Sequence, residues 1–438
     1  MHRPNPARPL RALAASALVV GAIALGACSP PASSPSPSAT DSSPAKPNAE
    51  EQRVAAAATK KVAAAQIAVS GLAEIVDGFR AALKGEKPDT VVETATKAGT
   101  DLWARAVATA QGTIAELPAA KDEDRGLYWA RLTMRVALED WAGGHGDRGA
   151  RLADAVDALE YASRGYGDAT FTADGARHVM LSGFDPFGDW KKEPFLSNPS
   201  GAIALHLDGR TIDTPQGPVV FQAVMLPVSW AEFDRGVVER AYAPVLAPGD
   251  ADADVVATIS QGVYPEFSIE QWAGAFRDGA PDNRGEGAPE GFREEVPAAT
   301  GFPQPPKTLQ FIETTLPYEA MIAAGTTPSA VKLNPIACTS KTEARGDDDT
   351  TCDIVPPAPD ALAASGSGGA YLSNESMYRA NRLRIGLGRD DVRGGHLHTP
   401  VPDYTGVDDT GRGEAFEAQR HAVVDQAQAL LLAAATAG

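Results

Sequence analysis

The sequence predicts an α/β fold with a doubly wound, mostly parallel sheet flanked by helices, preceded by an α-helical N-terminal region. Apolar runs typical of buried strands occur at residues 178–184, 218–228 and 253–260. Helical patterns at residues 230–246 and 317–325 are interspersed with such runs. Strands that alternate with helices indicate a parallel sheet, and functional sites collect at the carboxyl ends of its strands.

The helical region, residues 49–166, is rich in alanine and has helical periodicity. We expect four helices here, within residues 52–83, 90–117, 124–143 and 149–163. Breakers such as "KGEKPD" and "GGHGD" separate them, so a small antiparallel bundle is predicted. Its Trp and Tyr residues are most simply core, and no set of possible ligands stands out in it.

The N-terminus, "MHRPNPARPLRALAASALVVGAIALGAC", has a basic start and a short apolar stretch that ends in small residues before Cys28. The "LGAC" run resembles a bacterial lipobox. We therefore interpret residues 1–27 as a lipoprotein-type signal peptide and residues 28–48 as a Pro/Ser-rich tether. Lipidated Cys28 would anchor an extracytoplasmic protein to the bacterial cell membrane. The alternative is an ordinary signal peptide cut nearby, with Cys28 incidental.

Length and charge limit the possible partners. The chain has 438 residues, of which 43% are hydrophobic, so it can bury a sizeable core. Its formal net charge is −18, which argues against nucleic acid or another polyanion as a partner. The charge decides nothing about small substrates.

Two further cysteines, Cys338 and Cys352, flank a polar loop. In the oxidising compartment that export implies, we expect them to form a disulfide; two free thiols are the alternative. Metal binding is not expected there, because no His or further Cys lies near enough in the sequence. The chain has no nucleotide-binding fingerprint and no H-E-x-x-H motif, so no cofactor and no metal are predicted.

Three segments that follow predicted strands carry groups suited to chemistry. Phe184 and Phe187 flank a turn and could wall a small apolar pocket, although core under a loop is an equally good interpretation. Glu270 follows a strand that ends near Gln261. The third segment, "VRGGHLHTPVP", contains His396 and His398, which we expect to face opposite sides of a strand.

A fourth segment, "SGSGGAYLSNESMYRANRL", places Ser373 where a helix is expected to begin. Together with His398 and Glu270, Ser373 supplies a nucleophile, a base and an orienting carboxylate. Ser373 also suits a helix N-cap, for which Asn374 and Ser376 compete.

Five motifs in order resemble the landmarks of the type I pyroglutamyl-peptidase family. They are "SGFDPFG…NPSG", "LPVSW", the segment from Gln261 through Glu270 to "PDN", "GGAYLSNESMY" and "GHLHTP". The resemblance covers roughly residues 176–435. It implies a phosphorylase/hydrolase-like α/β domain of cysteine peptidases that remove an N-terminal pyroglutamyl residue.

The resemblance also implies roles for individual residues. Phe184 and Phe187 would line the pocket for the lactam ring, with Gln261 beside it and with Tyr371 and Leu372 approaching the ring. Glu270 would be the catalytic carboxylate and His398 the catalytic base. The spacing from Gln261 to Glu270 is one residue shorter than in the family.

The family's nucleophilic cysteine is replaced by Ser373 in this chain. A thiol near a helix N-terminus and an imidazolium ionises readily, whereas a serine must lose its proton to the base as it attacks. A serine avoids thiol oxidation outside the cell, and loss of catalysis explains the change equally well.

Three hypotheses follow. The first is a membrane-tethered peptidase that removes a pyroglutamyl group or a similar small cap from peptides, with Ser373 as nucleophile. The second is a catalytically inactive lipoprotein that binds capped peptide ends or an envelope component. The third places the main function in the helical region.

Overall fold

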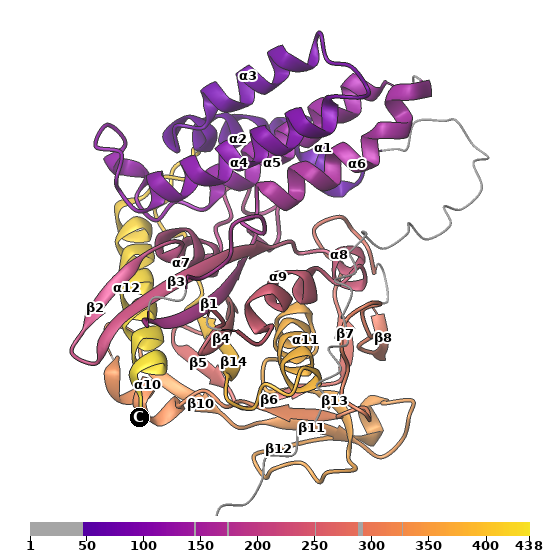
Figure 1. Ribbon diagram of the computed structural model, residues 1–438, viewed down its shortest axis with the longest axis vertical. Coiled ribbons are helices and arrows are strands. Elements are labelled where there is room, and N and C mark those ends of the chain that lie inside the picture. The colour runs from indigo at the N-terminus through magenta and orange to yellow at the C-terminus, as the bar shows by residue number, and fades with distance from the viewer. Residues whose placement is uncertain (1–46, 144–145, 173–174, 250, 288–291, 326) are drawn as a thin grey trace, which may run out of the picture. The chain divides into compact units, whose positions relative to one another are not determined.

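A seven-stranded mixed sheet forms the centre of the α/β region (Figure 1). The structure is a computed structural model that describes residues 47–143, 146–172, 175–249, 251–287, 292–325 and 327–438. Residues 1–46, which include the predicted signal peptide and Cys28, lie outside the described residues.

The strand order in this sheet is β10-β5-β14-β4-β1-β3-β2. The strands are β1 (Arg177–Phe184), β2 (Thr211–Thr214), β3 (Gly217–Leu226), β4 (Val255–Gln261), β5 (Phe267–Glu270), β10 (Val331–Asn334) and β14 (Arg393–Thr399). Strands β3, β1, β4 and β14 are parallel, whereas β2 and β5 are antiparallel to their neighbours β3 and β14. The expectation of a mostly parallel sheet with a helical N-terminal region is confirmed.

Helices cover both faces of the sheet. They are α7 (Pro199–Leu207), α8 (Trp230–Asp234), α9 (Val237–Leu246), α10 (Tyr318–Ala324), α11 (Leu372–Gly386) and α12 (Glu414–Thr436). One face packs on α7, α10 and α12, and the other packs on α9 and α11. Alternation along the strands produces the two cores: Val255 and Ala257 of β4 belong to the first and Val256 to the second.

Short sheets extend the α/β region beside α11. They pair β6 (Trp272–Gly274) with β9 (Phe311–Glu313), β7 (Phe276–Gly279) with β8 (Phe292–Glu295), and β11 (Ala337–Ser340) with both β12 (Thr350–Asp353) and β13 (Leu362–Ser365). Two single-turn 3₁₀ helices lie at Pro118–Ala120 and Asp347–Asp349.

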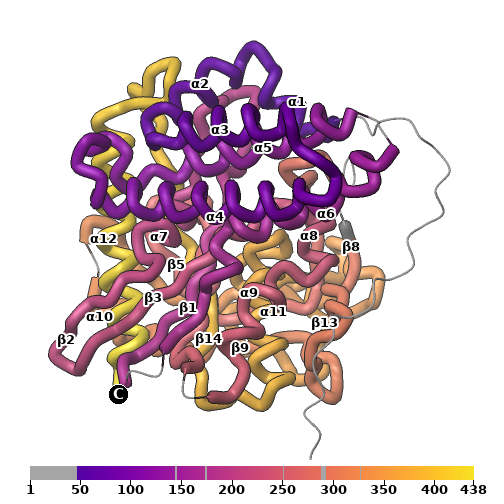
Figure 2. Tube along the Cα trace, turned by 45° about the horizontal axis from the view of Figure 1, so that its top comes forward, coloured from indigo at the N-terminus to yellow at the C-terminus, as the bar shows by residue number. Residues whose placement is uncertain are grey.

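The helical region contains more breaks than the sequence predicts. Its helices are α1 (Ala49–Ala55), α2 (Ala57–Val69), α3 (Ala73–Leu83), α4 (Val91–Ala110), α5 (Arg125–Ala142) and α6 (Gly146–Ala162). The predicted helix over residues 52–83 is divided at Ala56, which is extended, and at Gly71, whose φ of +65° is left-handed. Helices α4 and α6 pack side by side over a common apolar core (Figure 2).

Within the described residues, no single helix has the length and hydropathy needed to cross a membrane; α2 and α3, bent by 108° at their junction, meet both criteria only as a pair.

Asp208 links the helical region to the sheet. Asp208 directly follows α7. Its carboxyl group accepts hydrogen bonds from Trp103 Nε1 of α4 (3.0 Å) and from the backbone N–H of Ala223 in β3 (2.8 Å). Burial raises the pKa of Asp208 to about 7. The carboxyl group therefore holds a proton in the folded protein at pH values where the unfolded chain has lost it.

Asp208→Asn should change how stability depends on pH. Between the ordinary pKa of 3.8 and about 7, the folded state binds a proton that the unfolded state does not, so the Asp208 contribution falls as pH rises. The stability of the variant relative to wild type should then increase from pH 4 to pH 8, by at most about 4 kcal/mol. Urea unfolding at several pH values measures this. Asp213→Asn, at an exposed position on β2, is the control; a wild-type-to-variant gap for Asp208→Asn that stays constant with pH would contradict the assignment.

Candidate active site

The eight side chains that the sequence nominates in the α/β region line one cavity of about 400 Å³. They are Phe184, Phe187, Gln261, Glu270, Tyr371, Leu372, Ser373 and His398. Strands β1, β4 and β5 end at this cavity, β14 brings His398 to it one residue before its own end, and the first turn of α11 completes it. The predicted residues are thus brought together where the parallel strands β1, β4 and β14 end, with the short antiparallel strand β5 beside them. Their chemical roles stay predictions.

His398 and Glu270 form a direct pair in the cavity wall. Glu270 is 1% exposed, and its Oε1 lies 2.8 Å from His398 Nδ1. Its other oxygen, Oε2, accepts a hydrogen bond from Asn334 Nδ2 at 2.8 Å, and the same amide donates to the carbonyl of Ser367 at 2.7 Å. The carboxyl group is therefore fixed from both sides, and the His398 ring is oriented with Nε2 as its remaining nitrogen.

Gly368 allows the chain to pass close to this pair. A Cβ atom at Gly368 would lie 3.1 Å from His398 Cε1 and 3.4 Å from Glu270 Cγ. A side chain at this position would press on the His398 imidazole, which would have to give by a few tenths of an ångström, so glycine leaves the pair undisturbed.

Ser373 lies inside the first turn of α11. The expectation that Ser373, Asn374 or Ser376 caps the helix is wrong: the N-cap is Tyr371, which makes no side-chain cap hydrogen bond. The first intrahelical acceptor is the Tyr371 carbonyl, which binds the N–H of Glu375. The preceding N–H groups of the helix lack an intrahelical acceptor, as at any helix start, and the helix dipole favours negative charge there.

His396 and His398 lie on the same face of β14, so the expectation of opposite faces is wrong. Residues two apart on a strand share a face, and the intervening Leu397 points into the opposite core. The two rings are 4.6 Å apart. His396 is hydrogen-bonded to Thr258 Oγ1 (2.7 Å) and to Ser260 Oγ (2.8 Å), and burial lowers its pKa well below the ordinary value. It is therefore a neutral imidazole behind His398.

Aromatic side chains form one wall of the cavity. Phe187 stacks on Tyr371 with ring centroids 5.3 Å apart, and Trp230 meets Tyr371 edge-on at 5.0 Å. Burial raises the pKa of Tyr371, so its phenol stays neutral. Gln261 lines the cavity as well, and its Oε1 is buried without a hydrogen-bond partner among the described residues. An apolar wall and one unpaired acceptor suit a small ligand with an N–H group.

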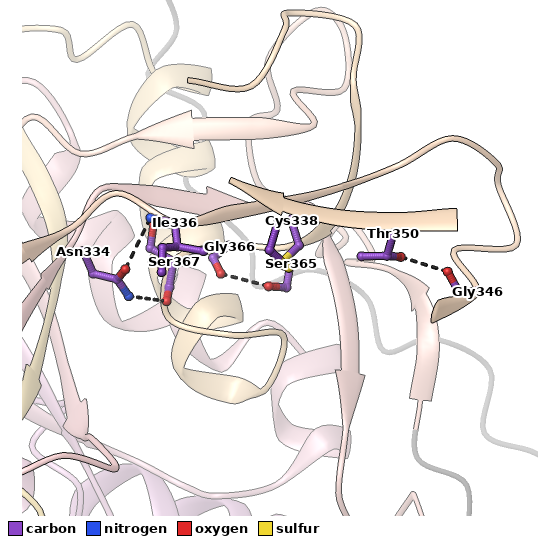
Figure 3. Close-up of a disulfide and its surroundings, with 9 residues drawn as sticks. Asn334, Ile336, Cys338, Gly346, Thr350, Ser365, Gly366 and Ser367 are labelled. Atoms are coloured by element: carbon purple, nitrogen blue, oxygen red, sulfur yellow. Dashed lines mark hydrogen bonds between the residues drawn. A yellow bond between two sulfur atoms is a disulfide. The ribbon is translucent and has the colours of Figure 1, made fainter. Parts of the chain in front are cut away.

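Cys338 and Cys352 are joined by a disulfide between paired positions of β11 and β12 (Figure 3). Figure 3 also shows Asn334, whose Oδ1 accepts from the N–H of Ile336 (3.3 Å) just before β11. Strand β11, which carries Cys338, therefore begins three residues after Asn334, whose side-chain amide donates to Glu270.

Sequence reasoning missed Asn334, Gly368 and Ser260 as parts of this site. Asn334 lies on a strand with no motif around it, Ser260 directly precedes the segment that begins at Gln261, and Gly368 lies in the quoted glycine-rich run. The described parts of residues 285–306 and of the loop between Cys338 and Cys352 contribute no cavity-lining residue. In the described part of the chain, no three His, Cys, Asp or Glu side chains are grouped to hold a metal ion.

A buried ionic network holds α11 behind the cavity. Arg379 Nε donates to Glu375 Oε1 at 2.7 Å, and Arg379 Nη1 donates to Glu239 Oε1 of α9 at 3.0 Å. All three side chains are almost fully inaccessible to solvent. The position of the helix that carries Ser373 thus depends on charges that must stay paired.

Comparison with known proteins identifies two matching family profiles. The PA0049 N-terminal domain matches residues 31–160, and the PA0049 C-terminal domain matches residues 178–303 and 337–403. The uncharacterized protein PA0049 of Pseudomonas aeruginosa is 32% identical over 426 residues, covering 77% of this chain and 76% of that protein.

Among solved structures, similar chains include pyroglutamyl peptidase I from Bacillus amyloliquefaciens, at 18% identity and a TM-score of 0.37 over 59% of this chain and 93% of that one. Pyrrolidone carboxyl peptidase from Thermus thermophilus is 21% identical with a TM-score of 0.33, over 57% of this chain and 99% of that one.

Arg379→Met should destabilise the protein by about 3–5 kcal/mol, because two buried carboxylates lose their shorter ion pair. Each keeps a longer one, from Arg382 to Glu239 (3.3 Å) and from Arg277 to Glu375 (3.7 Å). Urea unfolding measures the loss. Arg235→Met is the matched control: Arg235 pairs with Asp157, both side chains are about half exposed, and the loss should stay below about 1 kcal/mol. Equal losses for the two variants would show that the network around α11 contributes no more than a surface ion pair.

Proposed function

The chain belongs to the PA0049 family, and from that premise we propose that it is a serine-dependent hydrolase that removes a small N-terminal acyl cap, such as pyroglutamyl, from peptides. The observation that carries the proposal is the His398–Glu270 pair on the same cavity as Ser373, which lies in the first turn of α11. The five sequence motifs that resemble landmarks of the pyroglutamyl-peptidase family support the choice of substrate. We further propose that Cys28 carries a lipid and tethers the enzyme outside the cytoplasm, on the strength of the N-terminal sequence.

In the proposed reaction, Ser373 Oγ attacks the carbonyl carbon of the cap as His398 Nε2 takes the hydroxyl proton. Glu270 orients the imidazole through Nδ1 and stabilises the imidazolium that forms. The open N–H groups in the first turn of α11 would hold the oxyanion. His398 then gives its proton to the leaving amine, and a water molecule, activated by the same imidazole, hydrolyses the acyl-serine.

Pocket chemistry supports a small cyclic cap. Phe184, Phe187 and Leu372 offer an apolar surface to a ring, and the unpaired Gln261 Oε1 offers an acceptor to a lactam N–H. An acceptor buried without a partner is unfavourable in the free protein, so a ligand donor would satisfy it.

A second candidate is a binding protein for capped peptide ends, and one observation is compatible with it. Ser373 Oγ forms no hydrogen bond with another described residue, so nucleophile and base are not engaged in the free protein. Hydrogen bonds of catalytic groups often form only with substrate in place, so this observation agrees with both candidates.

Ser373 variants separate the two candidates. Purified wild type should release the fluorophore from pyroglutamyl 7-amido-4-methylcoumarin, and a serine-directed fluorophosphonate should add once, at Ser373, by intact mass and peptide mapping. Ser373→Ala should lower kcat by at least about 10³-fold and abolish labelling while it keeps affinity for pyroglutamyl peptide. Ser373→Cys should stay active, because a thiol at a helix N-terminus ionises more easily. A silent, unlabelled wild type beside an active Ser373→Cys would identify a binding protein that has lost its nucleophile.

Asn334→Ala should lower kcat by about 10- to 100-fold with little change in KM, because Glu270 loses the amide that fixes its orientation. The rate of fluorophosphonate labelling should fall in parallel, since labelling needs the same activated serine. Thr351→Ala, at an exposed position on β12, is the control and should leave both rates unchanged. If KM rises and the labelling rate does not change, Asn334 acts on substrate binding and not on the base.

A further inference from the structure

A loop that walls the cavity is held by the helical region. We define the pocket loop as residues 185–198, between β1 and α7; it contributes Phe187 and Asn198 to the cavity. Several of its polar and aromatic groups find partners on α1, on α5 and in the segments just before α5 and just after α6, as the following contacts show.

The first contact fixes the start of the pocket loop. Asp185 is 2% exposed and forms ion pairs with Arg131 of α5 and, at 2.8 Å, with Arg164, which follows α6. Arg164 is also bound by Glu160 of α6 at 2.8 Å. Because a buried carboxylate needs its cations, the loop cannot leave this position without a large cost.

The second contact fixes the middle of the loop. Trp190 stacks on Tyr128 of α5, with ring centroids 5.3 Å apart and an interplanar angle of 16°. It meets Trp129 edge-on at 5.6 Å, and the guanidinium of Arg53 in α1 lies 4.7 Å from its ring centre. The indole is thus enclosed by aromatic rings and a cation of the helical region.

Arg53 joins this contact to a second wall segment. Its Nη1 donates to Tyr128 Oη (2.9 Å) and its Nη2 donates to the carbonyl of Asn283 (2.6 Å). Asn283 in turn accepts from Trp190 Nε1 at 3.0 Å and donates to the carbonyl of Pro186 at 2.9 Å. Phe187 therefore lies between Pro186 and Trp190, which are both hydrogen-bonded to Asn283, and Asn283 is in turn bound by Arg53.

The third contact fixes the end of the loop. Asp124, just before α5, accepts from Ser197 Oγ and from the backbone N–H of Asn198 (2.7 Å). Asn198 Nδ2 donates a hydrogen bond to the backbone carbonyl of Asp185 at 3.0 Å. The two ends of the loop are thereby joined to each other and to the helical region.

We propose that the helical region determines the shape of the acyl pocket, with Arg53 and Tyr128 as positioning residues that act on substrate selectivity through Trp190 and Phe187. The proposal rests on the proposed function for its enzymatic readout. It assigns to residues 49–166 a role in substrate binding, in place of a separate activity.

Arg53→Ala in the otherwise intact protein tests it. KM for pyroglutamyl 7-amido-4-methylcoumarin should rise about tenfold while kcat changes less than about threefold, because the pocket wall loosens and the triad does not. Hydrogen–deuterium exchange should rise in residues 186–197, and trypsin should cut faster after the exposed Lys191 and Lys192 of the loop. Tyr128→Leu should produce the same changes in KM, exchange and cleavage. Arg53→Lys should produce smaller changes than Arg53→Ala but should not match wild type, since an ammonium cannot reproduce the two-nitrogen contact.

Arg80→Ala is the control within the same region: Arg80 lies on α3, is about half exposed and, among the described residues, forms an ion pair with Asp77 alone, at 4.0 Å. It should change neither exchange nor KM. Unchanged exchange in residues 186–197 for Arg53→Ala would overturn the proposal, and so would a rise spread evenly over the α/β region, which indicates general destabilisation. Exchange and proteolysis need no turnover, so they decide the proposal even if wild type leaves the amide intact, a result that counts against the proposed hydrolase alone.

Discussion

The carboxyl group of Glu270 imposes the constraint on which the rest of the site depends. At 1% exposure it cannot rely on water, and an unpaired carboxylate in that position would cost several kcal/mol. His398 and Asn334 satisfy one oxygen each, and each comes from a strand that neighbours β5 in the sheet. The backbone at Gly368 passes close to both members of the pair, and a Cβ atom there would lie 3.1 Å from His398 Cε1.

The mixed direction of the sheet makes this arrangement possible. Strand β5 runs antiparallel to β14, so Glu270 pairs in register with His396 and Ser268 pairs with His398. Glu270 therefore lies opposite His396, two residues before His398 on β14, and its side chain reaches the His398 imidazole from there. Strand β10 is parallel to β5 and pairs Asn334 directly with Glu270. A wholly parallel sheet would not bring Glu270 and His398 together in this way.

The central strands and the members of the cavity could be predicted because their signals are local. Buried strands show apolar runs, and the resemblance placed eight side chains that share one cavity. Part of that resemblance comes from residues with a structural role: Asn198 of "NPSG" caps α7, and Ser200 Oγ accepts a hydrogen bond from the N–H of Phe184. What failed depends on backbone geometry or on distant contacts. Gly71 and Ala56 divide a helix that looks continuous, and Asn334 gains its role only from a strand pairing that a single sequence does not show.

Buried charged groups connect the helical region to the α/β region. Asp185 starts the pocket loop, but the cations that neutralise it lie on α5 and directly after α6. The same holds for Asp124, which stands before α5 and accepts hydrogen bonds from the far end of the loop. Each region thus buries polar groups that only the other satisfies, so neither set is favourable alone. An α/β region whose cavity wall depends on partners of this kind has its pocket geometry coupled to the helices.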